Sequence, residues 1–248
     1  KFTPALVLPF SHPRPFSHQE KGGSSLLSPS GREAGSEGWR GRKISDWHKG
    51  YLMPLSQEVR LLCDEVRRFI RDEVDPRSRW IEENDAIPED LFQKTRAVGL
   101  FGLTIPEEYG GSGLDLAGKC AIEEEMGKTN YGFATLIGNH TGISTTGIVA
   151  LGNEHQKKKY LPRMATGEWV GSFALTEPQA GSDPSALRTT AVKKGDRYVL
   201  NGEKIYITNA GLAHVFTVMA VTDKAKGIKG IYAFIIERDF PGFSVGRN

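Results

Sequence analysis

The residues best suited to chemistry lie in the stretch SFALTEPQAGSDPSAL, residues 172–187. Thr176 and Ser182 offer hydroxyls, and Gly181 lets the backbone come close to a ligand. Consecutive exposed amides of this kind suit phosphates or the carbonyl edge of a heteroaromatic ring. The same residues can also form two consecutive turns that bind nothing, because Pro, Gly, Ser and Asp are common turn residues. The spacing alone leaves both interpretations open.

A second stretch, KIYITNAG at residues 204–211, is expected to end a β-strand. Side chains alternate along a strand, so Tyr206 and Thr208 are predicted to lie on the same face. A flat aromatic ring beside a hydroxyl suits a planar ligand with hydrogen-bonding atoms at its edge.

Other catalytic motifs are absent from the sequence. Gly111-Ser112-Gly113 lacks a third glycine at the required spacing and does not follow a strand, which excludes a dinucleotide-binding fingerprint. There is no phosphate-binding Walker motif and no GxSxG nucleophile motif, and no two histidines stand four residues apart. His140, in an apolar segment, is expected to be a hydrogen-bonded core histidine.

The secondary structure that should position the two stretches is predicted to change from helices to strands along the chain. Apolar residues at spacings of three and four predict helices before Gly167, and alternation of two predicts short strands after it. The predicted helices span 56–74, 88–99, 115–126 and 133–151, with a short charged helix that ends before Pro162. The predicted strands lie within 168–175, 186–194, 197–210, 214–223, 231–237 and 242–247, with a hairpin turn at 194–197.

This order predicts an α+β chain with three parts. Residues 1–52, rich in Ser, Gly and Pro, are predicted to be a disordered extension. A helical domain is expected over 53–168 and an incomplete β domain over 169–248.

Composition narrows the function classes. The net charge of +2 and the absence of a long apolar run argue against nucleic-acid binding and against a membrane span. Cys63 and Cys120 are too far apart in sequence for a redox or zinc motif, which fits a reducing compartment. We expect the protein to be located in the bacterial cytoplasm, with the mitochondrial matrix as the alternative.

The motifs GLTIPEEYGG, ALTEPQAGSD and NGEKIYITNAG, in this order, resemble the acyl-CoA dehydrogenase family over residues 55–248. The resemblance implies a helical domain, a middle β-barrel-like domain and a C-terminal helical bundle, with FAD between the last two. It also implies an acyl-CoA substrate, an electron-transfer flavoprotein as acceptor, and a homotetramer when the protein is full length.

Carried over by position, the resemblance implies a cofactor site in the two stretches. Thr176 would bond the pyrimidine side of the flavin, Tyr206 would pack on the ring and Thr208 would bond near N5. Ser182 would contact both the FAD phosphates and bound acyl-CoA. The full set of implied FAD-binding residues is Phe173, Ala174, Leu175, Thr176, Glu177, Gly181, Ser182, Tyr206, Ile207 and Thr208.

In the family, a carboxylate removes the proton α to the thioester while the β-carbon gives a hydride to flavin N5, which yields a trans-2-enoyl-CoA. That carboxylate belongs to the C-terminal bundle, which would follow Asn248, so we name no catalytic residue and assign Glu177 to the flavin loop. We therefore expect FAD-dependent dehydrogenation from the full-length protein and not from these 248 residues alone. The alternatives are an acyl-CoA oxidase or flavin monooxygenase of the same fold, and a non-catalytic flavin-binding or interaction fragment.

Overall fold

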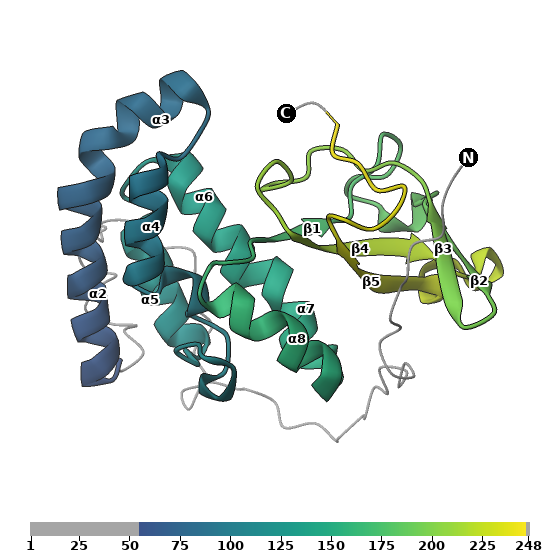
Figure 1. Ribbon diagram of the computed structural model, residues 1–248, viewed down its shortest axis with the longest axis horizontal. Helices are drawn as coiled ribbons and strands as arrows, with labels where there is room; N and C mark the ends of the chain where they lie inside the picture. The colour runs from purple at the N-terminus through teal and green to yellow at the C-terminus, as the bar shows by residue number, and fades with distance from the viewer. Residues whose placement is uncertain (1–54, 247–248) are drawn as a thin grey trace, which may run out of the picture.

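The structure, a computed structural model, describes residues 55–246. The predicted disordered extension, residues 1–52, lies outside the described residues. Helices come first along the chain and strands follow, and Figure 1 shows the two groups side by side. The predicted α+β order is confirmed.

The helical half begins and ends its helices at the residue types that favour helix ends. The Ser56 hydroxyl accepts a hydrogen bond from the Val59 amide, and the Asp115 carboxylate accepts one from the Gly118 amide. Both starts were predicted. The helices are α2 (Gln57–Phe69), α3 (Ser78–Asn84), α4 (Glu89–Ala97), α5 (Leu116–Met126), α6 (Tyr131–Asn139), α7 (Thr145–Leu151) and α8 (Glu154–Ala165).

The helices differ from the prediction at three places. Helix α3 was not predicted. The single helix predicted over 133–151 is two helices, because Gly142 leaves the helical conformation within a π-helical turn, His140–Ser144. The prediction that the charged helix ends before Pro162 is wrong, since α8 continues to Ala165.

Packing explains why Pro162 does not end α8. A proline inside a helix costs about 3 kcal/mol, because it removes a hydrogen bond and its ring crowds the preceding turn. Tyr160, Leu161 and Met164 are all buried around it. Burial of such side chains contributes about 1.5–3 kcal/mol each, which together exceeds the cost of the proline.

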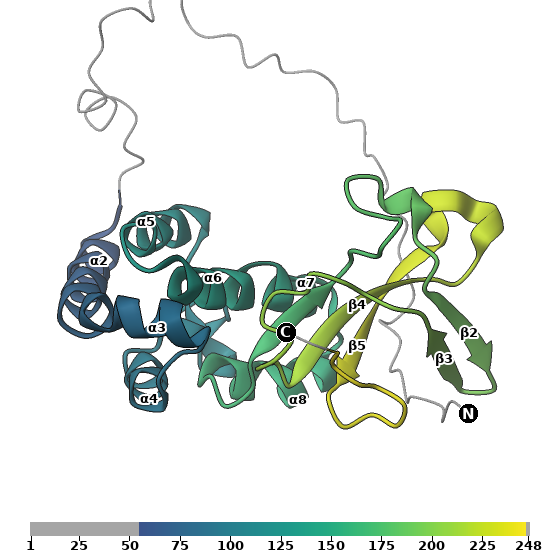
Figure 2. The same cartoon turned by 90° about the horizontal axis from the view of Figure 1, so that it is seen from above.

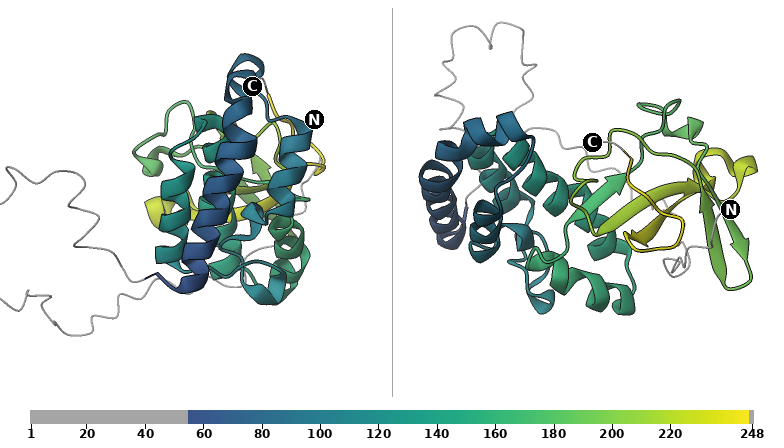
Figure 3. Two further views of the ribbon diagram at one scale, coloured as in Figure 1. Left: turned by 90° about the vertical axis from the view of Figure 1, so that its left-hand side faces the viewer. Right: turned by 45° about the horizontal axis from the view of Figure 1, so that its top comes forward.

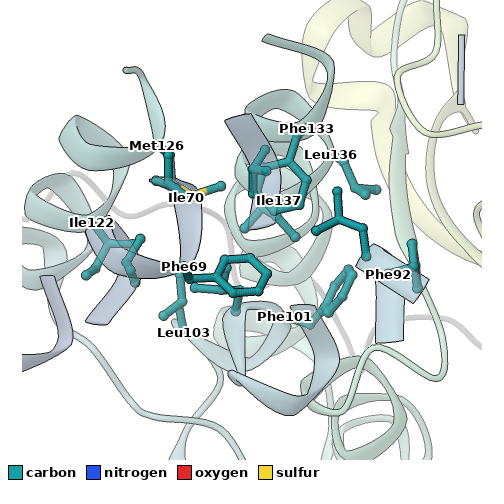
Figure 4. Packing of buried hydrophobic residues seen from close by; sticks show 14 of the residues in the cluster. Phe69, Ile70, Phe92, Phe101, Leu103, Ile122, Met126, Phe133, Leu136 and Ile137 are labelled. Carbon is teal, nitrogen blue, oxygen red and sulfur yellow. The ribbon is translucent and has the colours of Figure 1, made fainter. Parts of the chain in front are cut away.

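One core of the helical half consists of side chains from α2 through α6. Phe69 of α2 lies 6.3 Å from Phe133 of α6, and Phe92 of α4 lies 5.2 Å from Phe101, measured between ring centroids. Figure 4 shows these rings with the aliphatic side chains between them. This packing fixes the position of α6, while Ile148 of α7 and Tyr160 of α8 pack with Val215 and Ile235 of the sheet.

The sheet is mixed and open in the described part of the chain. Its strands are β1 (Gly171–Ala174), β2 (Thr190–Lys194), β3 (Arg197–Asn201), β4 (Val215–Val221) and β5 (Ile231–Glu237). Strand β4 pairs in parallel with β1 and, at one residue pair, with β2, and it pairs antiparallel with β5. The predicted hairpin is confirmed, because β2 and β3 pair from Lys194 opposite Arg197. The implied barrel is not closed in this sheet.

Two strand predictions are wrong. Residues 242–246 form no strand. The strand predicted over 197–210 ends at Asn201, and residues 202–212 are irregular. Tyr206 and Asn209 have positive φ angles of 55° and 67°, which break the extended backbone. Tyr206 and Thr208 are therefore not placed by strand alternation.

His140 joins the two halves of the molecule. Its Nδ1 accepts a hydrogen bond from the Gly171 amide at the start of β1 (2.9 Å), and its Nε2 lies 3.1 Å from the Met164 carbonyl in α8. The ring is fully buried, so the prediction of a hydrogen-bonded core histidine is confirmed. Figure 2 shows β1 as the strand next to the helices, and in Figure 3 the β2–β3 hairpin lies at the opposite end.

Candidate functional site

The two predicted stretches lie side by side at one end of β1. The Ile205 amide donates to the Thr176 carbonyl (3.0 Å), and Lys204 Nζ donates to the Leu175 carbonyl (2.9 Å). Lys204 Nζ also contacts Glu177 Oε1 at 2.6 Å. Residues 175–177 are thus bound to residues 204–205, and the structure brings together stretches that are 29 residues apart.

The Glu177 carboxylate is the centre of this arrangement. Its Oε2 accepts from the Arg188 amide (2.6 Å) and from Gln179 Nε2 (2.5 Å), and its Oε1 accepts from the Thr189 amide (3.0 Å) and from Lys204. Burial opposes ionisation, but the hydrogen bonds from Lys204 and the two amides outweigh it and lower the pKa of Glu177 to about 2. Glu177 therefore stays ionised and fully bonded.

The far end of residues 204–211 is held by other side chains. The Ser172 hydroxyl donates to the Thr208 carbonyl (2.6 Å), and Asn209 Nδ2 donates to the Leu136 carbonyl of α6 (3.0 Å). Arg238 donates to the carbonyls of Ala210, Gly211 and Ala213. These bonds stabilise the left-handed conformations of Tyr206 and Asn209, each of which costs about 1–3 kcal/mol.

Several predicted site residues keep polar or aromatic groups free between these attachments. Within residues 55–246, the hydroxyls of Thr176, Thr208 and Ser182 make no hydrogen bond, and Tyr206 is 90% exposed. Gly181 is exposed, and a Cβ at this position would meet no atom within 4 Å. Three hydroxyls, the backbone of Gly181 and the ring of Tyr206 are thus available on the two loops that meet at one end of β1.

The other predicted site residues are buried or half-buried. Ala174 is buried in the sheet core, and Phe173, Leu175 and Ile207 are half-buried. Ile207 also lines a shallow cleft between the sheet loops and the helices. The cleft is lined by Ile81, Asp85, Ala86, Ile87, Gly132, Leu136, Ile207, Asn209, Ala210, Gly211 and Leu212. This cleft, with both polar and apolar lining, therefore extends from residues 207–212 toward α6.

The sequence patterns missed four residues that hold the site: Lys204, Ser172, Asn209 and Arg238. Each bonds to backbone carbonyls of distant residues. Position 204 offered one signal, a lysine inside a predicted strand and directly before Ile205, because a lysine that is buried there requires a partner. Ser172 and Arg238 carry no such local signal.

Metal and membrane sites find no support in the described residues. Between residues 55 and 246, no three His, Cys, Asp or Glu side chains gather closely enough to hold a metal ion. No helix in that range combines the length and apolarity that a bilayer crossing requires.

Fold and site together define an α+β protein in which two sheet-domain loops carry unpaired hydroxyls and an exposed aromatic residue. Residues 56–168 match the model of the acyl-CoA dehydrogenase N-terminal domain, and residues 172–248 match that of the acyl-CoA dehydrogenase middle domain. The chain belongs to the acyl-CoA dehydrogenase family. The resemblance drawn from the three motifs is confirmed.

Individual relatives agree with this membership. An acyl-CoA dehydrogenase of Bacillus subtilis (strain 168) is 42% identical over 195 residues, covering 79% of this chain and 52% of the relative. The crystal structure of an acyl-CoA dehydrogenase complexed with FAD from Bacillus anthracis gives a TM-score of 0.69 at 40% identity, covering 78% of this chain and 33% of that one.

A third similar chain comes from a structure of the electron transferring flavoprotein of Acidaminococcus fermentans, which concerns the mechanism of flavin-based electron bifurcation. It gives a TM-score of 0.75 at 39% identity, covering 79% of this chain and 51% of that one. The chain spans about half the length of the curated relatives it matches.

Proposed function

We propose that the full-length protein to which these residues belong is an FAD-dependent dehydrogenase that converts an acyl-CoA thioester to its trans-2-enoyl-CoA. One observation carries the proposal: the unpaired hydroxyls of Thr176 and Thr208 and the exposed Tyr206 lie on two loops that buried bonds hold together. Membership of the acyl-CoA dehydrogenase family supports the same reaction class.

The donor set fits FAD. An isoalloxazine ring has one flat face for an aromatic side chain and polar atoms at its edges, which the Thr176 and Thr208 hydroxyls can bond. The exposed backbone at Gly181 and the Ser182 hydroxyl can bind phosphate oxygens. FAD, when bound, supplies the redox chemistry. The role of the loops is to orient it.

Glu177 does not supply the base that removes the α-proton. Both of its oxygens are occupied by protein donors, and its pKa of about 2 makes it a poor proton acceptor at neutral pH. We propose that the base belongs to a part of the full-length protein outside residues 55–246. We also propose an electron-transfer flavoprotein as the acceptor and a homotetrameric assembly.

The test is anaerobic addition of octanoyl-CoA or isobutyryl-CoA to the FAD-loaded full-length protein. We expect bleaching of the flavin absorbance and reoxidation by an electron-transfer flavoprotein. The variant Thr176→Val keeps the shape of the side chain and removes its hydroxyl, so it should bind FAD more weakly with unchanged thermal stability. Rapid hydrogen peroxide formation in air would indicate an oxidase instead. Bound FAD that no acyl-CoA reduces would indicate a non-catalytic flavin protein.

A further inference from the structure

The ion pair of Glu177 and Lys204 is buried to a degree that stability does not explain. Their side chains are 2% and 10% exposed, and the charged atoms lie 2.6 Å apart. Removing two charges from water costs several kcal/mol, and a buried pair is often no more stable than apolar residues of similar volume. A buried pair of this kind is best explained by the geometry that it enforces.

The geometry in question is the spacing between the two loops that present the hydroxyls. Lys204 bonds the carbonyl of Leu175 and the carboxylate of Glu177, which are the two residues on either side of Thr176. The Ile205 amide also donates a hydrogen bond to the Thr176 carbonyl, and Tyr206 is the next residue in the chain. The pair therefore ties the backbone at Thr176 to the segment that carries Tyr206.

Glu177 also fixes the base of the loop that carries Gly181 and Ser182. Its carboxylate binds the amides of Arg188 and Thr189, where the loop returns to the sheet, and its backbone pairs with Ala180. One buried carboxylate thus holds the entry and the exit of the loop as well as the second stretch.

We propose that Glu177 and Lys204 are positioning residues of the flavin site: without touching FAD through their side chains, they hold Thr176, Tyr206 and Thr208 at the separation that the isoalloxazine ring requires. The inference rests on the proposed function. Direct contact between the Glu177 carboxylate and a ligand is excluded by its four protein donors.

The experiment measures the FAD dissociation constant of the full-length protein by quenching of flavin fluorescence, with the visible absorption spectrum and reduction potential of the bound flavin. The variants are Lys204→Met, which removes the charge at similar length, and Glu177→Gln, whose amide places N–H groups opposite the existing donors. The matched control is Glu125→Gln on α5. Glu125 is also buried, at 9% side-chain exposure, and pairs with Arg67 and Lys128 in the helical half.

We expect both site variants to raise the FAD dissociation constant at least about tenfold, because binding depends on pre-organised loops. The bound flavin should show shifted absorption bands and a changed reduction potential. Glu125→Gln should lose thermal stability and change neither property. If Lys204→Met does not fold, Lys204→Gln carries the test, since its amide can still donate to the Leu175 carbonyl, and an increase of about threefold is then expected.

Three results would overturn the assignment. Wild-type affinity and spectrum in the site variants would show that the pair does not position the flavin. Equal weakening by Glu125→Gln would show that only global stability is involved. If the unchanged full-length protein does not bind FAD, the proposed function fails first and this inference fails with it, which separates the two failures.

Discussion

Protonation of His140 should weaken the connection between the helices and the sheet. Its Nδ1 is an acceptor for the Gly171 amide, and its Nε2 must carry the proton that the Met164 carbonyl accepts. A second proton on Nδ1 would place two N–H groups against each other. Burial lowers the pKa of His140 from 6.5 to about 4, and the bond to the Met164 carbonyl opposes this only in part.

The size and sign of the effect follow from proton linkage. The folded protein resists protonation at His140, while the unfolded chain binds the proton once the pH falls below 6.5. The contribution of His140 is therefore complete above that pH and is lost progressively down to about pH 4. Between about pH 7 and about pH 5 the loss is about 2 kcal/mol, at roughly 1.4 kcal/mol per pKa unit.

The assay compares urea unfolding of the unchanged protein and His140→Gln at those two pH values. Gln can donate and accept like a neutral imidazole but does not titrate in this range. His214 also has a lowered pKa, mainly through burial, but it is present in both proteins and cancels in the comparison. His155→Gln, at an exposed position, is the control and should keep the full pH dependence. An equal pH dependence in the unchanged protein and His140→Gln would refute the reasoning.

Three further substitutions test separate parts of the structure. Gly111→Ala places a Cβ in collision with the Ile105 carbonyl oxygen, and we expect a loss of unfolding free energy above about 2 kcal/mol by urea unfolding. Asp115→Ala removes the cap of α5 and should cost about 1 kcal/mol in the same assay, a cost that Asp115→Asn should largely avoid. A Cβ at position 181 meets no protein atom within 4 Å, so Gly181→Ala should leave unfolding unchanged and weaken FAD binding, measured by fluorescence quenching. Unaltered FAD binding by this last variant would argue against a ligand at Gly181.

The helical half could be predicted from the sequence wherever local chemistry decides the structure. Ser56 and Asp115 begin helices because their side chains satisfy free amides, and the period of α2 needs no tertiary information. Local rules failed at Pro162, where buried neighbours outweigh the cost of proline, and at Gly142, whose backbone leaves the helical conformation within a buried segment. Packing between distant elements decides these positions.

The residues of the candidate site also differ in how well the sequence predicts them. Thr176 and Tyr206 could be selected from the sequence because hydroxyls and aromatic rings are the groups that a ligand contacts. The reason given for Tyr206 was nevertheless wrong, because its backbone is left-handed and not part of a strand. Its exposure depends on bonds made by neighbouring residues.

Those bonds could not be predicted, because their acceptors carry no sequence signal. Lys204, Asn209 and Arg238 each bind backbone carbonyls, and every residue has one. Only the fold determines which carbonyl is within reach. Side chains that touch a ligand are limited by its chemistry and can be recognised from the sequence. Side chains that position them are limited by three-dimensional distance, so they become visible only when the structure is known.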